Sequence, residues 1–255
     1  MLIANPIGAV VDAIFASALE NIDASHAWVG LLCYTLQIYF DFSGYSDMAI
    51  GLAQMFGIRF LENFNYPYAS RSIREFWRRW HISLSNWFRD YLYVSLGGNR
   101  ISKHRLYLNI LTVFLLCGLW HGASWNFIIW GLFHGIFLAL ERTTIFTWVL
   151  QRIPRVFEHL YTLTIVSYGW VFFRSPTLEY SIGFTRTLLG LQLRHNHINI
   201  PIKRYLDIKV ILVTILAILG SSGALSALIR VIKDIPNHYS NRHVRMSANL
   251  ALTLL

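Results

Sequence analysis

Charge is the scarcest property of this chain. Asp, Glu, Lys and Arg make up 14% of its 255 residues, whereas an average soluble domain carries about 25%. Hydrophobic residues supply 55% of the chain, much of it in long runs. A membrane-spanning helix needs about 20 mostly apolar residues. The composition is therefore atypical of a soluble domain and predicts an all-α, polytopic helical membrane protein.

Cysteine is also scarce, and the chemistry that cysteine supports is correspondingly absent. Cys33 and Cys117 both lie in apolar runs and give neither a disulfide framework nor metal-ligand spacing. His195 and His197 form a pair with too few ligands to argue a metal site. The chain also lacks a phosphate-binding glycine loop and a nucleophile elbow. We expect no bound metal and no tightly bound cofactor.

Positive charge exceeds negative charge, with a formal net charge of +9. The basic residues flank apolar runs, so retention of loops on the cytoplasmic side explains them better than nucleic-acid binding does. Nine Trp and thirteen Tyr fit aromatic belts at the two faces of a bilayer. We therefore expect a lipid bilayer as a partner and no nucleic acid.

Apolar segments organise most of the chain. A long segment at residues 26–56 contains Asp41 and Asp47, and it is expected to bend around Ser43–Gly44. The two carboxylates either line a polar path or cap a helix break locally. A polar loop is expected at residues 174–204. The other apolar segments are 2–19, 145–173 (interrupted at 152–158), 208–232 and an unfinished run from 246.

Charges return between residues 62 and 105. At a helical step of about 100° per residue, apolar and basic side chains of residues 71–91 fall on opposite faces, with His81 at the boundary. The pattern predicts one amphipathic helix on the cytoplasmic side, either at the membrane surface or dipping into the membrane as a re-entrant segment. Arg78, Arg79 and Trp80 could hold an anionic donor there. A basic membrane anchor explains the same arginines and is the commoner use of such a cluster.

Residues 106–141 form an apolar run long enough for two membrane helices, which we expect to meet near residues 120–125. His121 lies at that break, between Gly118 and Gly122. A titratable group at membrane depth is costly and usually faces a cavity, and a neutral imidazole suits a general base. A core histidine bonded to a neighbouring helix is the equal alternative. His134 is favoured as a structural residue, and the repeated small-xxx-small glycines predict close helix packing.

Three motifs carry a resemblance to a known family. RRWHISLS at residues 78–85, LGGNR at 96–100 and LWHGASW at 119–125 closely resemble the membrane-bound O-acyltransferase family, and within it the alginate O-acetyltransferase branch. The resemblance covers residues 3–173 well. It implies a multi-helix membrane enzyme that moves an acyl group towards an exported polymer. The related D-alanyl transfer branch shares both motif histidines.

The resemblance also implies roles for individual residues. His121 corresponds to the histidine taken as catalytic in the family, and His81 to a second functional histidine. Arg78, Arg79 and Trp80 are then candidates for binding substrate, while Ser124 and Asn126 could donate to a carbonyl oxygen as it gains charge. The acyl donor, acetyl-CoA or an acyl carrier, would be a substrate. The expected partners are the bilayer and the exported proteins of polysaccharide acetylation.

Family members are longer than this chain. We therefore expect residues 1–255 to form a single membrane-embedded domain that lacks N-terminal helices and the end of the last helix, and whose activity alone is in question. The expected location is the bacterial cytoplasmic (inner) membrane, with several passes. Three rival functions stay open at this stage: D-alanyl or other acyl transfer to a cell-wall polymer, a non-catalytic scaffold for an exported transferase, and a transport subunit.

Overall fold

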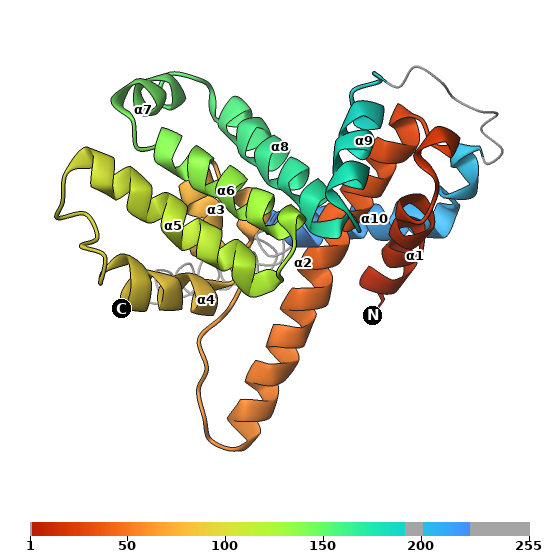
Figure 1. The fold of residues 1–255 in the computed structure, drawn as a ribbon. Coiled ribbons are helices and arrows are strands. Elements are labelled where there is room, and N and C mark those ends of the chain that lie inside the picture. Colours follow the sequence, from red (N-terminus) through yellow and green to blue (C-terminus); the bar gives the residue numbers. More distant parts are fainter. Residues whose placement is uncertain (1, 192–200, 225–255) are drawn as a thin grey trace, which may run out of the picture.

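The computed structural model describes residues 2–191 and 201–224, and every regular element within them is helical (Figure 1). The all-α prediction is confirmed. Besides short 3₁₀ turns and a π-helix at Phe88–Tyr93, the α-helices are α1 Ala4–Phe15, α2 Ala24–Met55, α3 Ile73–Arg79, α4 Ile82–Trp87, α5 Lys103–His121, α6 Trp125–Leu140, α7 Thr144–Leu150, α8 Arg155–Arg174, α9 Leu178–Leu188 and α10 Ile208–Ser221.

Among the described residues, no single helix is both long enough and apolar enough to cross a membrane. The pair α6 and α7 meets the length and composition requirement jointly, with an 83° bend between its two members.

Helix α2 is the central element, with α1, α9 and α10 on one side and α5, α6 and α8 on the other (Figure 1). Asp23 begins α2 by accepting hydrogen bonds from the backbone N–H groups of Ser25 and His26. The helix continues for 32 residues, so the predicted bend around Ser43–Gly44 is wrong. A single glycine costs a helix about 1 kcal/mol, which is too little to break one whose backbone bonds continue on both sides.

The predicted amphipathic helix is also not continuous. Helix α3 ends at Arg79, Trp80 is extended, and His81 is left-handed with φ +44° before α4 begins. Residues 63–65 cause the break, because they take backbone bonds that a helix would use. Asn65 N–H donates to Arg79 O (3.0 Å), and Ile82 N–H donates to Asn63 O (2.9 Å).

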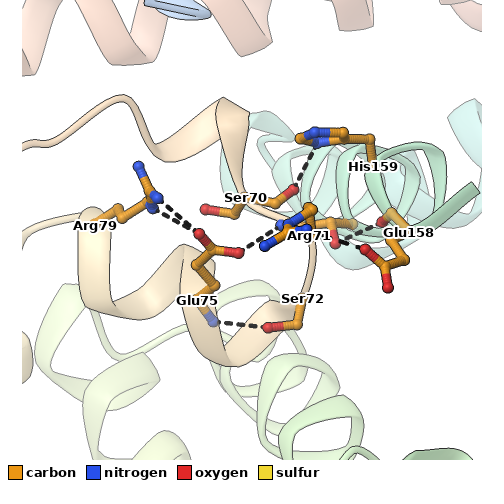
Figure 2. Close-up of polar contacts among 8 residues, drawn as sticks. Ser70, Arg71, Ser72, Glu75, Arg79, Glu158 and His159 are labelled. Carbon is orange, nitrogen blue, oxygen red and sulfur yellow. Dashed lines mark hydrogen bonds and ion pairs between the residues drawn. The ribbon is translucent and has the colours of Figure 1, made fainter. Parts of the chain in front are cut away.

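Helix α3 is fixed at its N-terminus by side chains from its own first turn and from α6 and α8. Ser72 accepts from Glu75 N–H, and the Glu75 carboxylate accepts from the N–H of Arg71, the residue before the cap, in a variant of the capping box (Figure 2). The buried carboxylate of Glu141 accepts from the backbone N–H groups of Ile73 (2.6 Å) and Arg74 (3.0 Å). These bonds fix the N-terminus of α3, the helix that leads into the break at His81.

Helices α5 and α6 form the expected pair, and they meet at residues 122–124 as predicted. Gly118 of α5 faces Gly131 of α6. A Cβ on Gly118 would clash with the carbonyl oxygen of Phe127, and one on Gly131 would clash with that of Phe114. The prediction of close packing through the glycines is therefore confirmed.

Two other segments complete the fold. Residues 174–204 are not simply a loop, because α9 occupies Leu178–Leu188: Thr177 caps it, and Phe184 buries its ring against Phe15 with centroids 4.6 Å apart. Asp12 of α1 forms an ion pair with Arg174 of α8 at 2.6 Å. Three predicted features lie outside the described residues: the histidines at 195 and 197, residues 225–232 of the predicted 208–232 span, and the run from 246.

Candidate functional site

His81 and His121 line the same cavity, which has a volume of about 410 Å³. The cavity lies between α2, the break between α3 and α4, the C-terminal end of α5, and helices α6 and α8. Two residues 40 positions apart in the sequence thus come to one place. The other lining residues are polar or aromatic for the most part: Tyr34, Gln37, Ile38, Asp41, Phe42, Trp80, Trp120, Trp130, Trp170 and Phe173.

His121 is the last residue of α5. Gly122 ends the helix with φ +157°, and a Cβ at that position would press on the ring of Phe127. The imidazole packs edge-on against the rings of Trp130 and Phe173, at centroid distances of 5.1 and 5.0 Å. No hydrogen bond joins this imidazole to the rest of the described chain, so aromatic packing orients the ring and its nitrogens are available to a substrate.

His81 owes its position to the break between α3 and α4. A non-glycine residue with positive φ is uncommon, and such strain concentrates at functional sites. The ring packs edge-on against Phe42 at 4.7 Å, and its Nδ1 lies 3.3 Å from Asn63 Oδ1. Burial lowers the pKa of His81 to about 4. The imidazole is therefore neutral at physiological pH and has a lone pair that can accept a proton.

Of the predicted substrate-binding residues, Trp80 lines this cavity and Arg79 does not. The Arg79 guanidinium is held by Glu75 Oε1, at 3.0 Å from Nε and 2.7 Å from Nη2 (Figure 2). The pair braces α3 along its own length, as an i, i+4 pair does. A substrate would have to displace Glu75 to reach Arg79.

Arg78 lines a different cavity, of about 600 Å³, between α3, the π-helix and α5. Arg74 and Arg142 line it as well, and none of these three guanidiniums is ion-paired to a carboxylate in the part of the chain that the structure describes. Burial and the charge of Arg142 lower the pKa of Arg74. Three such cations around one cavity form an electropositive site open to an anion.

Ser124 and Asn126 do not line the cavity of the two histidines. Ser124 is exposed at the start of α6. Asn126 is buried, donates through Nδ2 to Ser175 O (2.7 Å) and accepts from Ser181 Oγ (3.3 Å). Its amide thus ties α6 to the junction of α8 and α9. The prediction that Ser124 or Asn126 donates a hydrogen bond to a reacting carbonyl is not supported by any contact that either residue makes with the cavity.

His134 is fully buried on α6, away from the cavity. Its ring packs edge-on against Trp77 (5.2 Å) and against Trp130 (5.3 Å), and neither of its nitrogens has a hydrogen-bond partner among the described residues. This placement agrees with the structural role favoured from the sequence. Sequence reasoning missed Gln37 and Asn63, which lie near His81 or in its cavity. An amide within an apolar helix was the only signal for Gln37, and none pointed to Asn63.

The two aspartates singled out in the sequence separate. Asp41 lines the cavity of the two histidines, whereas Asp47 lines another one between α2 and the N-terminus of α1. A single polar path through both carboxylates is therefore not what the described cavities show.

Comparison with known proteins places the chain among acyltransferases. A model of MBOAT, the membrane-bound O-acyltransferase family, matches residues 19–177. The chain is 54% identical over 182 residues to the "Probable alginate O-acetylase AlgI" of Pseudomonas aeruginosa, an alignment that covers 70% of this chain and 34% of that protein. It is 46% identical over 169 residues to the peptidoglycan O-acetyltransferase of Helicobacter pylori, covering 65% and 32%.

A more distant relative is the teichoic acid D-alanyltransferase of Bacillus subtilis, 38% identical over 113 residues that cover 42% of this chain and 29% of the relative. The alignments to all three proteins reach about a third of the relatives' length. The matched region includes α2 to α8 and both histidines of the cavity. The chain belongs to the membrane-bound O-acyltransferase family.

Proposed function

We propose that the cavity of His81 and His121 catalyses O-acyl transfer, moving an acetyl group from an intracellular thioester donor to a hydroxyl of an exported, alginate-like polysaccharide. The observation that carries this proposal is that both histidines, from motifs 40 residues apart, line one cavity. The burial that lowers the pKa of His81 keeps its imidazole neutral, which is the form that can accept a proton.

His121 is the proposed general base. It accepts the proton of the acceptor hydroxyl as that oxygen attacks the acyl carbonyl carbon. The new C–O ester bond forms, the thioester C–S bond breaks, and the proton passes from the imidazolium to the departing thiolate. Positioned acid–base catalysis of this kind contributes about 10²–10⁴-fold to a rate. His81, which lines the same cavity, orients the donor.

The donor's anionic part is assigned to the cavity of Arg74, Arg78 and Arg142. Acetyl-CoA and the prosthetic arm of an acyl carrier both bear phosphate, which guanidinium groups bind strongly. The apolar end of the same cavity reaches Cys117, one turn before His121 on α5. The path from phosphate to thioester would therefore run along α5. No tightly bound cofactor is required by this chemistry.

Acetyl rather than D-alanyl transfer is favoured by the comparisons. Alignment to the O-acetylating relatives covers 65–70% of this chain, whereas alignment to the D-alanyltransferase covers 42%. The proposed setting is the bacterial cytoplasmic membrane, with a multi-pass topology and with exported acetylation proteins as partners.

Complementation tests the proposal. The chain is expressed in a cell that lacks its own equivalent enzyme, and ester-linked acetate on the exported polymer is measured. Native protein should restore acetate and His121→Ala should not. His104→Ala is the matched control, since His104 is an exposed histidine at the other end of the same helix. Equal acetate from His121→Ala and native protein at equal membrane levels would overturn the catalytic assignment.

The rival functions make different predictions in the same cells. A scaffold would tolerate loss of both histidines while depending on Gly118 and Gly131. A transport subunit would move solute without forming an acyl ester.

A further inference from the structure

Asn63 lies in the connection between α2 and α3 and contacts the turn of His81 through both its backbone and its side chain. Its carbonyl oxygen accepts from Ile82 N–H at 2.9 Å. Its side-chain Oδ1 accepts from Ser83 N–H (3.1 Å) and from Ser83 Oγ (3.0 Å), and it lies 3.3 Å from His81 Nδ1. One residue therefore holds three consecutive positions of the break between α3 and α4.

The orientation of the Asn63 amide is determined by its neighbours. A backbone N–H can only donate, so the atom that faces Ser83 N–H must be the oxygen. The other end, Nδ2, donates to Ser46 Oγ of α2 at 3.2 Å. An amide oxygen can only accept, and this oxygen faces Nδ1 of His81.

We propose that Asn63 is a positioning residue that fixes His81 in the neutral Nδ1–H tautomer, so that Nε2 is the basic nitrogen of the ring. The opposite tautomer would set the Nδ1 lone pair against the Asn63 Oδ1 lone pairs at 3.3 Å. Ser83 Oγ does not remove this conflict, because it lies closer to Asn63 Oδ1 (3.0 Å) than to His81 Nδ1 (3.4 Å).

The arrangement follows a general rule for functional histidines. The hydrogen bond made by one ring nitrogen determines the protonation of the other. A neutral amide fixes the tautomer and stabilises the imidazolium much less than a carboxylate in its place would. His81 therefore stays neutral although Asp41 from α2 and His121 from α5 line the same cavity. The inference rests on the proposed function only for its catalytic meaning; the tautomer itself is a property of the fold.

The decisive experiment is nuclear magnetic resonance of the chain in detergent micelles with ¹⁵N-labelled histidine. The His81 signals are assigned by their loss in His81→Gln. Native protein should show His81 protonated at Nδ1 and bare at Nε2 at neutral pH. An Nε2–H tautomer, or an equal mixture of the two, would overturn the proposal. This measurement needs no variant of Asn63 and no activity.

A pair of variants distinguishes the contact between Asn63 and His81 from a general effect of added negative charge nearby. Asn63→Asp keeps every acceptor contact, and the Ser46 hydroxyl can rotate to donate. The added negative charge should raise the pKa of His81 by about one to three pKa units, as an opposite charge at hydrogen-bonding distance does. Asn65→Asp adds the same charge two residues away, on an exposed side chain that makes no contact with His81, and should leave that pKa within a few tenths. Equal shifts in the two variants would refute the inference.

The pH dependence of acetyl transfer tests whether the tautomer of His81 matters for catalysis. Ester-linked acetate formed by Asn63→Asp should fall about tenfold for each pH unit below the raised His81 pKa, while Asn65→Asp keeps the native profile. An unchanged profile in Asn63→Asp, with native protein active, refutes the role of Asn63 and leaves the proposed function standing. If native protein forms no acetyl ester at any pH, the proposed function fails, and the tautomer measurement still decides the structural claim.

Discussion

Two histidines of the α5–α6 pair lie in contrasting surroundings. His121 is the last residue of α5, at the turn that leads into α6, and it lines a cavity together with His81. His134 lies thirteen residues further along, inside a layer of Trp77, Trp130 and Trp170, with no exposed surface. Both occur in a Gly-x-x-His-Gly pattern, so the local sequence alone does not tell them apart.

The comparison teaches that function here depends on where helices stop. An imidazole inside continuous helices meets side chains from every direction and has no room for a substrate. An imidazole at a helix end lies beside backbone that has turned away, so space is left in front of it. His81 repeats the rule, because it too lies where one helix ends and another begins.

The largest expected difference comes from replacing each histidine by phenylalanine, which keeps an aromatic ring and removes the nitrogens. His121→Phe should lower the rate of acetyl transfer about 10²–10⁴-fold, the usual contribution of a general base. His134→Phe should keep near-native transfer. The measurement is the initial rate of ester formation at matched membrane levels. Comparable losses of transfer rate in the two variants would contradict the assignment of a catalytic role to His121 and a structural role to His134.

A smaller effect should come from crowding His134 without touching the cavity. The Cβ of Gly169→Ala would lie 2.6 Å from His134 Nε2, in a region with no slack. Overpacking of this kind typically costs about 1–3 kcal/mol of unfolding free energy. Thermal or denaturant unfolding in detergent measures the loss, and the acetylation rate of the remaining folded protein should be unchanged. Gly51→Ala is the control, since a Cβ there meets open space.

A further expected effect concerns the pH dependence of stability. The pKa of His81 is about 4 in the folded chain, against an ordinary 6.5. Between these values the unfolded chain binds the proton more readily, so stability rises with pH. The contribution of neutral His81 should be complete above about pH 6.5 and lost as pH falls to about 4. As the pH falls through this window, native protein should therefore lose stability relative to His81→Gln, and outside the window the difference between their unfolding midpoints should stay constant. Parallel curves throughout would show that burial does not perturb His81.

Local chemistry let the sequence predict a substantial part of this protein. Low charge and long apolar runs predicted an all-helical chain, and the break near residues 120–125 followed from Gly122 and the polar residues beside it. The resemblance of RRWHISLS and LWHGASW to a known family predicted that His81 and His121 act together, and the structure places both on one cavity. Small residues at 118 and 131 predicted that two helices approach closely. Each of these features depends on neighbours within a few residues.

The tertiary structure alone decided where helices continue, where they break and which side chains meet. Ser43 and Gly44 are residue types that favour a bend. Helix α2 nevertheless continues through them, because its backbone hydrogen bonds on both sides outweigh the low helix propensity of these two residues. The segment 73–91 has a clean helical pattern, yet backbone bonds from residues 63–65, distant in sequence, interrupt it at His81. Arg79 is held by Glu75, Asn126 is used to join helices, and Asn63 lies against His81. Such pairings depend on the competition between partners in three dimensions, which no spacing along the chain records.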